Sequence, residues 1–326
     1  MTLKKLAQLA NASVSTVSKA FSGKGDISDA TREHIFAVAR EHGCFQQFYH
    51  MPYDRPVVAV IIPEAISNTY IRYVEALRKL LEQNSYTMLL SISNFDPQML
   101  QELVRYYVEH NKVDGLVIIG GTATLPPDCK TALISVAKTA ECGACISSLL
   151  RPGLEACLRQ LYDMGHRRFA YVGEPLVEFK RITMEEILDE LGVAICPAHM
   201  ICSHRRFEEA GRDGMRRILA SGMPPPTVVI GGYGYVTAGI LEELSECGIS
   251  VPEEISVVST NDDGLPSRPG LEVAGMPDKT EQECEAIIRL LNERVGSERP
   301  NQPCTLDFPT TFRPGNTVAP PLHKNT

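Results

Sequence analysis

Residues 13–23 read SVSTVSKAFSG, and this stretch decides how the N-terminal part of the chain is interpreted. Val14, Val17, Ala20 and Phe21 have the three-four spacing of a buried helical stripe. The other positions are mostly Ser, Thr and Lys. They suit a helix that lies against phosphate, because hydroxyls, backbone N–H groups and the positive end of a helix all attract phosphate oxygens. The alternative is a solvated helix whose hydroxyls face only water.

The flanking segments predict two more short helices. Thr2 is placed to cap a helix over residues 3–10, Ser13 to cap the second helix, and Ser28 to cap a third that Gly43 ends. A short helix, a tight turn and a second helix form a helix-turn-helix, a motif that places its second helix in the major groove of DNA.

Composition is typical of a globular protein of two or three domains. The 326 residues are 44% hydrophobic and 22% charged. No apolar run approaches the roughly 18 residues that cross a bilayer. In MTLKKLAQLANA, Gln8 and Asn11 interrupt the apolar region too early for a secretion signal. We therefore expect a cytoplasmic protein that does not contact membranes.

Charge and cysteine patterns narrow the classes of partner. Residues 1–56 carry 7 Lys and Arg against 5 Asp and Glu, a net charge of +2, whereas the rest carries 25 against 35, a net charge of −10. Only the N-terminal part has surplus positive charge, which is the sign that attracts nucleic acid. The one close cysteine pair, Cys142 and Cys145, has no second pair or His at metal-ligand spacing. We expect reduced thiols, no metal and no cofactor.

From Pro56 onward, Val/Ile-rich strands alternate with amphipathic helices. The expected strands are residues 57–62, 87–92, 115–119, 169–172, 227–230 and 255–259. The expected helices are residues 71–83, 98–110, 154–164, 178–191, 207–220, 235–247 and 281–294. This alternation predicts parallel sheets covered on both faces, in two lobes.

The whole chain resembles one family. TLKKLAQLANASVSTVSKAFSG and ISDATREHIFAVAREHGC are similar, almost position by position, to the headpiece of LacI-family transcriptional regulators. KVDGLVIIGG, GHRRFAYVGEP and GISVPEEISVVSTND resemble landmarks of that family's core, in the expected order. The resemblance implies an all-α helix-turn-helix headpiece and a two-lobed α/β core like that of periplasmic sugar-binding proteins. It further implies a homodimer that binds a palindromic operator in double-stranded DNA, most often as a repressor, and a small-molecule effector.

The resemblance also divides the chain. The headpiece is expected at residues 1–43, an atypical hinge linker at 44–56 and the core at 57–326. The first lobe is expected to comprise about 57–150 with part of 277–300, and the second about 151–276 with the C-terminal strands.

Individual DNA-contacting residues follow from the headpiece motif. Val14, Ser15 and Lys19 occupy its base-reading positions. The phosphate contacts are expected at Thr2, Ser13, Thr16, Ser18 and Ser22, with Thr31 and Arg32 as neighbours. Arg32 is equally well explained as a helix-surface charge. Lys19 stands where the family usually has Arg, so a point charge replaces a bidentate fork and base discrimination should be softer.

The linker departs from the family pattern. Tyr53 occupies the position of the leucine that enters the minor groove from a hinge helix, and it directly follows Pro52, a residue hostile to helix interiors. We expect no typical hinge helix. Phe45, Phe48, Tyr49 and Tyr53 are instead expected to pack the linker onto the core or the partner subunit.

The expected effector cleft departs further. Where relatives place hydrogen-bonding pairs for sugar hydroxyls, this chain has Leu149-Leu150 and Tyr233-Gly234. The candidate ligand contacts are Ser67, Asn68, Tyr70, Lys180, Arg181, Tyr233, Asn261 and Asp262. Lys180 and Arg181 are alternatives for the usual arginine, or are surface charges. They favour an anionic metabolite over a sugar as effector, although another ligand or none remains open.

Two further points concern length and alternative functions. Residues 125–146 are too few for the usual helix, strand and loop, so we expect a strand of the first lobe to be shortened or lost. The chain has no nucleophile elbow and no phosphate-binding glycine loop, which argues against an enzyme. The other alternative is a small-ligand receptor without a DNA role, which would lack salt-sensitive DNA affinity.

Overall fold

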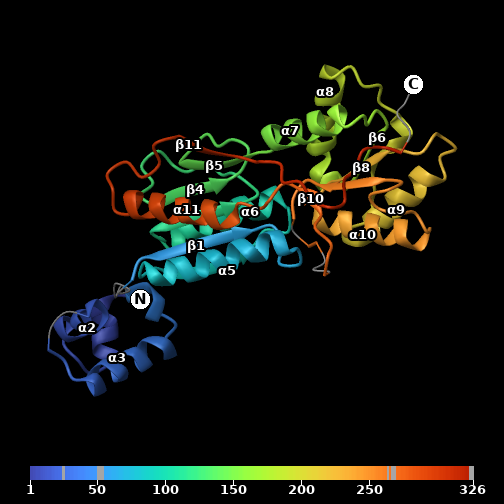
Figure 1. Ribbon diagram of the computed structural model, residues 1–326. Helices are drawn as coiled ribbons and strands as arrows, with labels where there is room; N and C mark the ends of the chain where they lie inside the picture. Colours follow the sequence, from blue (N-terminus) through green and yellow to red (C-terminus); the bar gives the residue numbers. More distant parts are fainter. Residues whose placement is uncertain (24–25, 50–54, 263, 266–268, 323–326) are drawn as a thin grey trace. The chain divides into compact units, whose positions relative to one another are not determined.

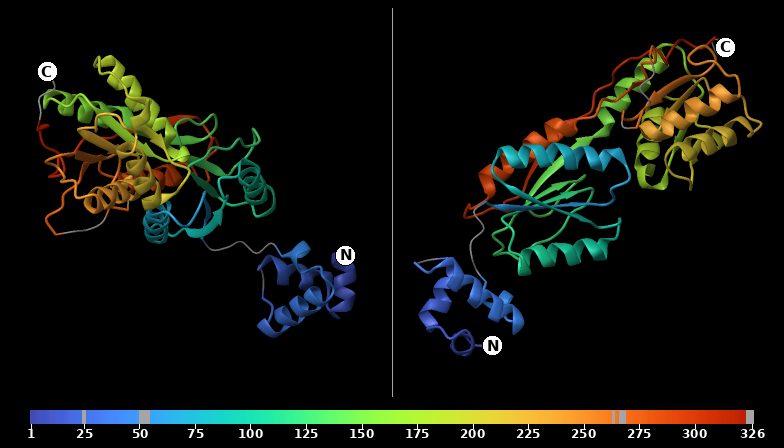
Figure 2. Two further views of the ribbon diagram at one scale, coloured as in Figure 1. Left: turned by 90° about the vertical axis from the view of Figure 1, so that its right-hand side faces the viewer. Right: turned by 90° about the horizontal axis from the view of Figure 1, so that it is seen from below.

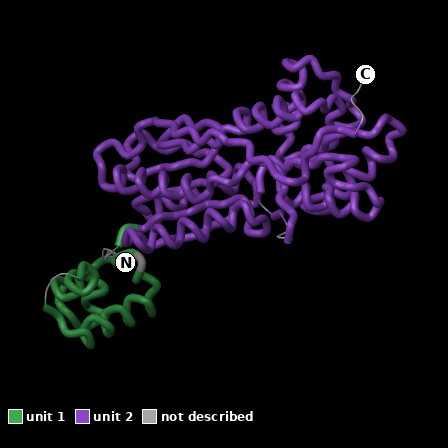
Figure 3. The backbone as a smooth tube through the Cα atoms, in the orientation of Figure 1, with its two compact units in different colours: residues 1–56 green, residues 57–326 purple. Residues whose placement is uncertain are grey.

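The computed structural model describes residues 1–23, 26–49, 55–262, 264–265 and 269–322. The chain divides into two compact units, Met1–Pro56 and Val57–Thr326 (Figure 3). Within the described ranges, no helix is both long enough and apolar enough to span a bilayer.

The first unit is helical. Its described residues form α1 (Leu3–Leu9), α2 (Val14–Ser22), α3 (Asp29–Glu41) and the one-turn α4 (Phe45–Phe48). The three expected caps are confirmed: the hydroxyl oxygens of Thr2, Ser13 and Ser28 accept hydrogen bonds from the N–H groups three residues later, at 3.2, 3.0 and 3.2 Å. Each such cap stabilises its helix by about 1 kcal/mol, because it satisfies one otherwise unpaired N–H group.

The core of the first unit lies between its helices. Val17, Ala20 and Phe21 of α2 are buried, together with Leu6 of α1 and Ile35 of α3. Val14, which we expected in the same stripe, is 45% exposed. It shares the apolar side of the helix but lies in the first turn, whose side chains the neighbouring helices leave uncovered.

The aromatic residues of the linker pack onto the first unit, a partner that the prediction did not include. The ring centroids of Phe45 and Phe48 lie 5.8 and 5.9 Å from that of Phe21, and Tyr49 stacks on Phe45 at 4.8 Å. The turn of α4 brings these rings to one side, where the small first unit gains apolar burial. Tyr53 lies outside the described residues.

The second unit contains two sheets whose paired strands are all parallel, as the strand and helix alternation predicted. The first sheet has the order β11-β5-β4-β3-β1-β2 and the second the order β10-β9-β8-β6-β7. The first-sheet strands are β1 (Val57–Ile62), β2 (Thr87–Ile92), β3 (Gly115–Ile119), β4 (Ala132–Val136), β5 (Ala144–Leu149) and β11 (Cys304–Pro309). The second-sheet strands are β6 (Phe169–Gly173), β7 (Met200–Cys202), β8 (Val228–Gly231), β9 (Ser256–Ser259) and β10 (Ala274–Gly275).

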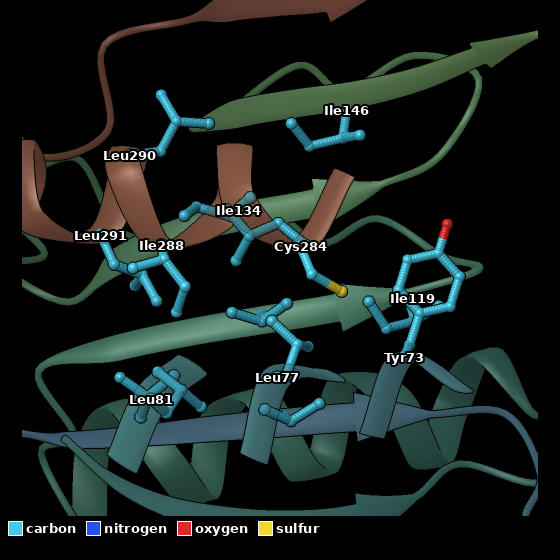
Figure 4. Close-up of a cluster of buried hydrophobic side chains, with 14 of the residues drawn as sticks. Tyr73, Leu77, Leu81, Ile119, Ile134, Ile146, Cys284, Ile288, Leu290 and Leu291 are labelled. Carbon is cyan, nitrogen blue, oxygen red and sulfur yellow. The ribbon is translucent and has the colours of Figure 1, made fainter. Parts of the chain in front are cut away.

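Helices cover both faces of each sheet. In the first lobe, α5 (Asn68–Gln83) and α11 (Thr280–Arg294) pack on one face and α6 (Pro97–Arg105) on the other, as the right view of Figure 2 shows. Figure 4 shows Leu77 and Leu81 of α5 and Ile288 and Leu291 of α11 lying against the central strands.

The second lobe is built in the same way. Its helices α7 (Leu150–Asp163) and α8 (Glu178–Glu190) share one hydrophobic cluster with the sheet, and α9 (Phe207–Leu219) and α10 (Gly234–Glu246) share another (Figure 1). The fold class expected from the sequence, a helix-turn-helix unit with a two-lobed parallel α/β core, is confirmed.

The shortened segment of the first lobe, around residues 125–146, contains two strands but not the usual helix. Strands β4 and β5 are both present and pair with each other and with β3 or β11. Residues 120–131 and 137–143, all of which the structure describes, contain no helix. The prediction of a lost strand is therefore wrong: removing a strand would break the hydrogen-bonded ladder, whereas removing a helix only uncovers one face. A hollow of about 420 Å³ beside α6, bordered by residues 124–126, lies in this region.

The C-terminal strand also differs from the prediction. We expected it in the second lobe, but β11 pairs with β5 in the first sheet, with Cys304 opposite Ala144. The chain then returns to the second lobe, where Arg313 bridges to Gly275 and Thr317 bonds to Val257. The two lobes are consequently joined three times, after β5, after β10 and after β11.

Candidate nucleic-acid interface and inter-lobe site

The candidate base-reading residues share an exposed surface of α2. Val14, Ser15 and Lys19 are all exposed, as is Ser18. The helix that carries them is held in place because its buried residues Val17, Ala20 and Phe21 are at most 3% exposed. A rigid helix with an exposed polar side can present those side chains to base edges without reordering.

Some of the expected phosphate ligands also build the helix caps. The hydroxyl oxygens of Ser13 and Thr16 lie 2.7 Å apart, as do those of Ser28 and Thr31. Each pair uses one hydroxyl hydrogen between its two oxygens, so the second hydrogen can be donated to a phosphate. The hydroxyl of Thr2 accepts the N–H of Lys5 and keeps its own hydrogen for donation.

The side chains of Ser22 and Arg32 are less accessible to a phosphate. Both are partly buried, and the Arg32 guanidinium lies 3.3 Å from the carboxylate of Asp29 on its own helix. This contact agrees with the reading of Arg32 as a helix-surface charge and competes with any phosphate.

The candidate ligand contacts of the first lobe lie at the start of α5. Ser67 is buried and precedes the helix, whereas Asn68 is exposed. Tyr70 lies deeper: burial, and secondly the carboxylate of Glu64, raises its pKa to about 12. Tyr70 therefore stays a neutral hydrogen-bonding phenol at any physiological pH.

The candidates of the second lobe separate into two groups. Lys180 reaches the strand ends, where its Nζ donates to the carbonyl oxygen of Gly232 at 2.8 Å and to the hydroxyl of Thr260 at 3.1 Å. Arg181 instead pairs with Glu178 and Glu185 of its own helix. Of these two alternatives, Lys180 is the one directed toward the carboxyl ends of the strands.

Asn261 and Asp262 follow β9 and stabilise loops. The Asn261 side-chain oxygen accepts the N–H of Gly234 at 3.1 Å, at the start of α10. Asp262 accepts the N–H of Asp278 at 3.2 Å and lies 3.9 Å from the Arg72 guanidinium of the first lobe. Leu149 is the last residue of β5 and Leu150 is the first residue of α7. Because leucine side chains have no polar atom, this pair offers no side-chain hydrogen bond to a ligand.

At the group of residues where the lobes meet, sequence reasoning named Tyr70 and Tyr233 but missed the charged residues and Phe207. We call Glu64, Tyr70, Glu174, Arg206, Phe207 and Tyr233 the inter-lobe cluster. Two guanidinium nitrogens of Arg206 donate to the two carboxylate oxygens of Glu64 at 2.8 and 2.9 Å, and its Nε lies 3.5 Å from Glu174.

Glu174 contacts two further members of the inter-lobe cluster besides Arg206. It accepts the hydroxyl of Tyr233 and the N–H of Phe207, the first residue of α9. Burial, and then the bond to Glu174, raises the pKa of Tyr233 far above its usual value. Phe207 has φ +58°, a left-handed conformation that is rare for bulky residues and that concentrates at functional sites.

A positional signal could have revealed this cluster. Glu64 and Glu174 each follow a buried parallel strand within two residues, and Tyr233 comes two residues after β8. In parallel sheets, ligands bind beyond the carboxyl ends of the strands. Arg206 was harder to find, because the three-residue strand β7 before it has no recognisable pattern.

Two family profiles match the chain. Residues 2–45 match the profile described as bacterial regulatory proteins, lacI family, and residues 158–318 match the periplasmic binding protein-like domain. Similar curated proteins include the HTH-type transcriptional regulator TreR of Escherichia coli K12, 25% identical over 80% of this chain and 84% of TreR. The HTH-type transcriptional repressor CytR of the same strain is 24% identical over 90% of each chain.

Solved structures share the fold. A LacI-family transcriptional regulator from Silicibacter pomeroyi has a TM-score of 0.71 at 20% identity, covering 98% of this chain and 99% of that one. The lac repressor dimer, bound to its operator and the anti-inducer ONPF, has a TM-score of 0.68 at 15% identity with the same coverage.

Proposed function

Because this chain belongs to the LacI family of bacterial regulatory proteins, we propose that it represses transcription by binding a palindromic operator as a dimer, and that a small molecule bound between the lobes modulates this binding. The observation that carries the proposal is the exposed surface of α2, where Ser15 and Lys19 face away from the buried apolar stripe and Val14 is exposed beside them in the first turn. Action on bacterial DNA requires that the protein work in the cytoplasm.

The proposed interface makes two kinds of contact with DNA, to base edges and to phosphates. Val14, Ser15 and Lys19 read base edges in the major groove, with the Lys19 ammonium donating to guanine. The hydroxyls of Thr2, Ser13, Thr16, Ser18, Ser22 and Thr31 hold phosphates, and Arg32 joins them where a phosphate replaces its contact with Asp29. Phosphate contacts fix the register of the helix, whereas base contacts select the sequence.

Exposed apolar side chains on the first lobe support a dimer. Leu90 and Ile92 on the edge strand β2 are 45% and 40% exposed, Phe95 follows that strand, and Met99 lies on α6. An uncovered edge strand with apolar side chains invites pairing with another chain. A twofold dimer would present two copies of α2 to two half-sites, which is why we expect a palindrome.

The effector is proposed to act on the contact between the lobes. A ligand shifts a conformational equilibrium only if it binds the two states differently. A molecule that enters the inter-lobe cluster must rearrange the contact between Glu64 and Arg206, so it necessarily discriminates between lobe arrangements.

The decisive experiment is selection of duplexes from the organism's fragmented genome by the purified full chain, followed by titration at several salt concentrations. We expect enrichment of sites with two inverted half-sites, and an affinity that falls steeply with salt because phosphate contacts release counterions. Equal binding of selected and random duplex would contradict the proposal. Ligand-induced stabilisation without DNA binding would favour a small-ligand receptor.

A further inference from the structure

In the inter-lobe cluster, two carboxylates and an aromatic ring contact one cationic side chain of the protein, Arg206. The Arg206 guanidinium makes two parallel hydrogen bonds to Glu64 and approaches Glu174 with its Nε. Its central carbon lies 4.5 Å from the centroid of the Phe207 ring, the geometry of a cation–π contact. Carboxylates from both lobes and an aromatic face thus surround one positive charge.

The negative partners are fixed, whereas the positive one is movable. The side chains of Glu64 and Glu174 are 9% and 2% exposed, but that of Arg206 is 39% exposed. Glu174 is further held by the hydroxyl of Tyr233 and by the N–H of Phe207. Arg206 lies directly before α9, and its long, partly exposed side chain can swing into solvent without disturbing a sheet or a helix.

The charge of a ligand decides whether it can replace the Arg206 guanidinium beside Glu64 and Glu174. A buried carboxylate that loses its cation is strongly unfavourable. An anionic ligand bound to Arg206 would add a negative charge beside two carboxylates, and a neutral sugar in place of the guanidinium would leave both carboxylates uncompensated. A ligand with its own ammonium or guanidinium group replaces the Arg206 charge by an equal one.

The other cations nearby do not reverse this argument. Lys180 donates to Gly232 and Thr260, and Arg181 pairs with two glutamates of its own helix. Arg72 pairs with Asp278 at 2.9 Å. To bind an anionic effector, any of these three side chains would have to leave contacts that it already makes.

We propose that Arg206 occupies the place of the effector's positively charged group, and that the effector is an organic cation carrying an ammonium or guanidinium group. This inference rests on the proposed function only in calling the ligand an effector. Ligand binding breaks the salt bridge between Arg206 and Glu64 and replaces it with one between the ligand's positively charged group and Glu64. The apparent affinity is reduced by the fraction of molecules in which Arg206 still fills the receptor.

The test uses the full chain, with ethylguanidinium chloride as a probe that matches the Arg206 head group and glucose 6-phosphate as the anionic comparator. In Arg206→Ala the competitor is gone, so we expect calorimetry to show ethylguanidinium binding at least tenfold tighter than in the unchanged protein. In the double variant that also carries Glu64→Gln, this gain should disappear, because the amide has the same shape without the charge. Glucose 6-phosphate should bind none of the three proteins.

Arg212→Ala is the matched control. Arg212 lies on α9, the helix that begins directly after Arg206, and pairs with Glu242 and Glu246 outside the cluster, so its loss should leave ethylguanidinium affinity unchanged. If Arg206→Ala does not fold, Arg206→Met keeps the apolar stem and serves in its place. The inference is overturned if the vacated cluster binds ethylguanidinium no better than the occupied one. It is also overturned if glucose 6-phosphate binds the unchanged protein and loses affinity in Arg206→Ala.

The two proposals fail separately. The calorimetry contains no DNA, so an absence of operator binding would count against the regulator and leave the cation receptor standing. Normal operator binding without any ethylguanidinium binding would count against the cation receptor alone.

Discussion

Replacing Phe45 by alanine tests whether the linker stabilises the DNA-binding unit. The Phe45 ring makes an edge contact with Phe36 at 5.1 Å, stacks on Tyr49 at 4.8 Å, and lies 4.7 Å from the Arg40 guanidinium carbon. Replacing a fully buried Phe by Ala costs about 3–5 kcal/mol, the cavity left behind included. Since Phe45 is only half-buried, we take about 2 kcal/mol for burial and about 1 kcal/mol for the stacking and cation contacts.

A loss of about 3 kcal/mol is large for so small a unit. At the usual 0.05–0.15 kcal/mol per residue, a unit of roughly 50 residues is stable by only about 3–8 kcal/mol. The substitution should therefore raise the unfolded fraction of the first unit about a hundredfold, because each 1.4 kcal/mol is a factor of ten.

Hydrogen exchange of the full chain measures this directly. In Phe45→Ala, the amides of Ile35 and Ala39 in α3 should exchange about a hundredfold faster, whereas those of Val58 and Val60 in β1 should not change. Tyr49→Phe, which keeps its ring, should leave the exchange of α3 nearly unaltered. Unchanged protection of α3 in Phe45→Ala would refute the idea that the linker aromatics form part of the headpiece core.

Three further predictions concern DNA binding, pH and assembly. Lys19→Ala should weaken operator binding by about 1–3 kcal/mol in a gel-shift titration, with Lys5→Ala as the milder control, and equal affinity for the original operator would remove Lys19 from the base-reading residues. Burial lowers the pKa of His166, which lies between the Thr227 hydroxyl and the Ala319 carbonyl. Neutral His166 therefore contributes its full stability to the folded core above about pH 6.5, the pKa of an unfolded histidine. That contribution is lost as the pH falls below about 6.5, because the unfolded state binds the proton more readily. The melting temperature of the core should therefore fall between pH 7 and 5.5, and His166→Gln should flatten that dependence, whereas an unchanged slope would argue against it. Met99→Glu should shift the sedimentation coefficient from dimer toward monomer without unfolding the core, and an unaltered coefficient would exclude this surface from the interface.

The fold could be predicted because its signals are local. Continuous apolar runs such as Val57–Ile62 fit only strands buried on both faces, and hydroxyl residues at Thr2, Ser13 and Ser28 mark helix starts. Strand β11 was assigned to the wrong lobe because its partner, β5, lies more than 150 residues away. No local pattern encodes such a pairing.

The proposed DNA-binding surface was predictable and the inter-lobe cluster was not, for the same reason. Val14, Ser15 and Lys19 lie within a single helix, so one periodicity describes them. The contact between Glu64 and Arg206 joins loops 142 residues apart, from different lobes. The comparison with sugar-binding positions of the family pointed to Leu149 and Tyr233. It did not point to Glu64 and Arg206, because that family pattern has no charged pair at their positions.

The interleaved path of the chain constrains how the core can be cut. A polypeptide that stops after β10 would retain every strand of the second sheet, yet it would lack α11 and β11 and so expose one face and one edge of the first sheet. Neither lobe is a continuous stretch of the gene. Producing the first lobe alone would require an internal deletion that joins residues 57–149 to 280–309, and nonsense mutations late in the reading frame should damage the N-terminal half of the core first.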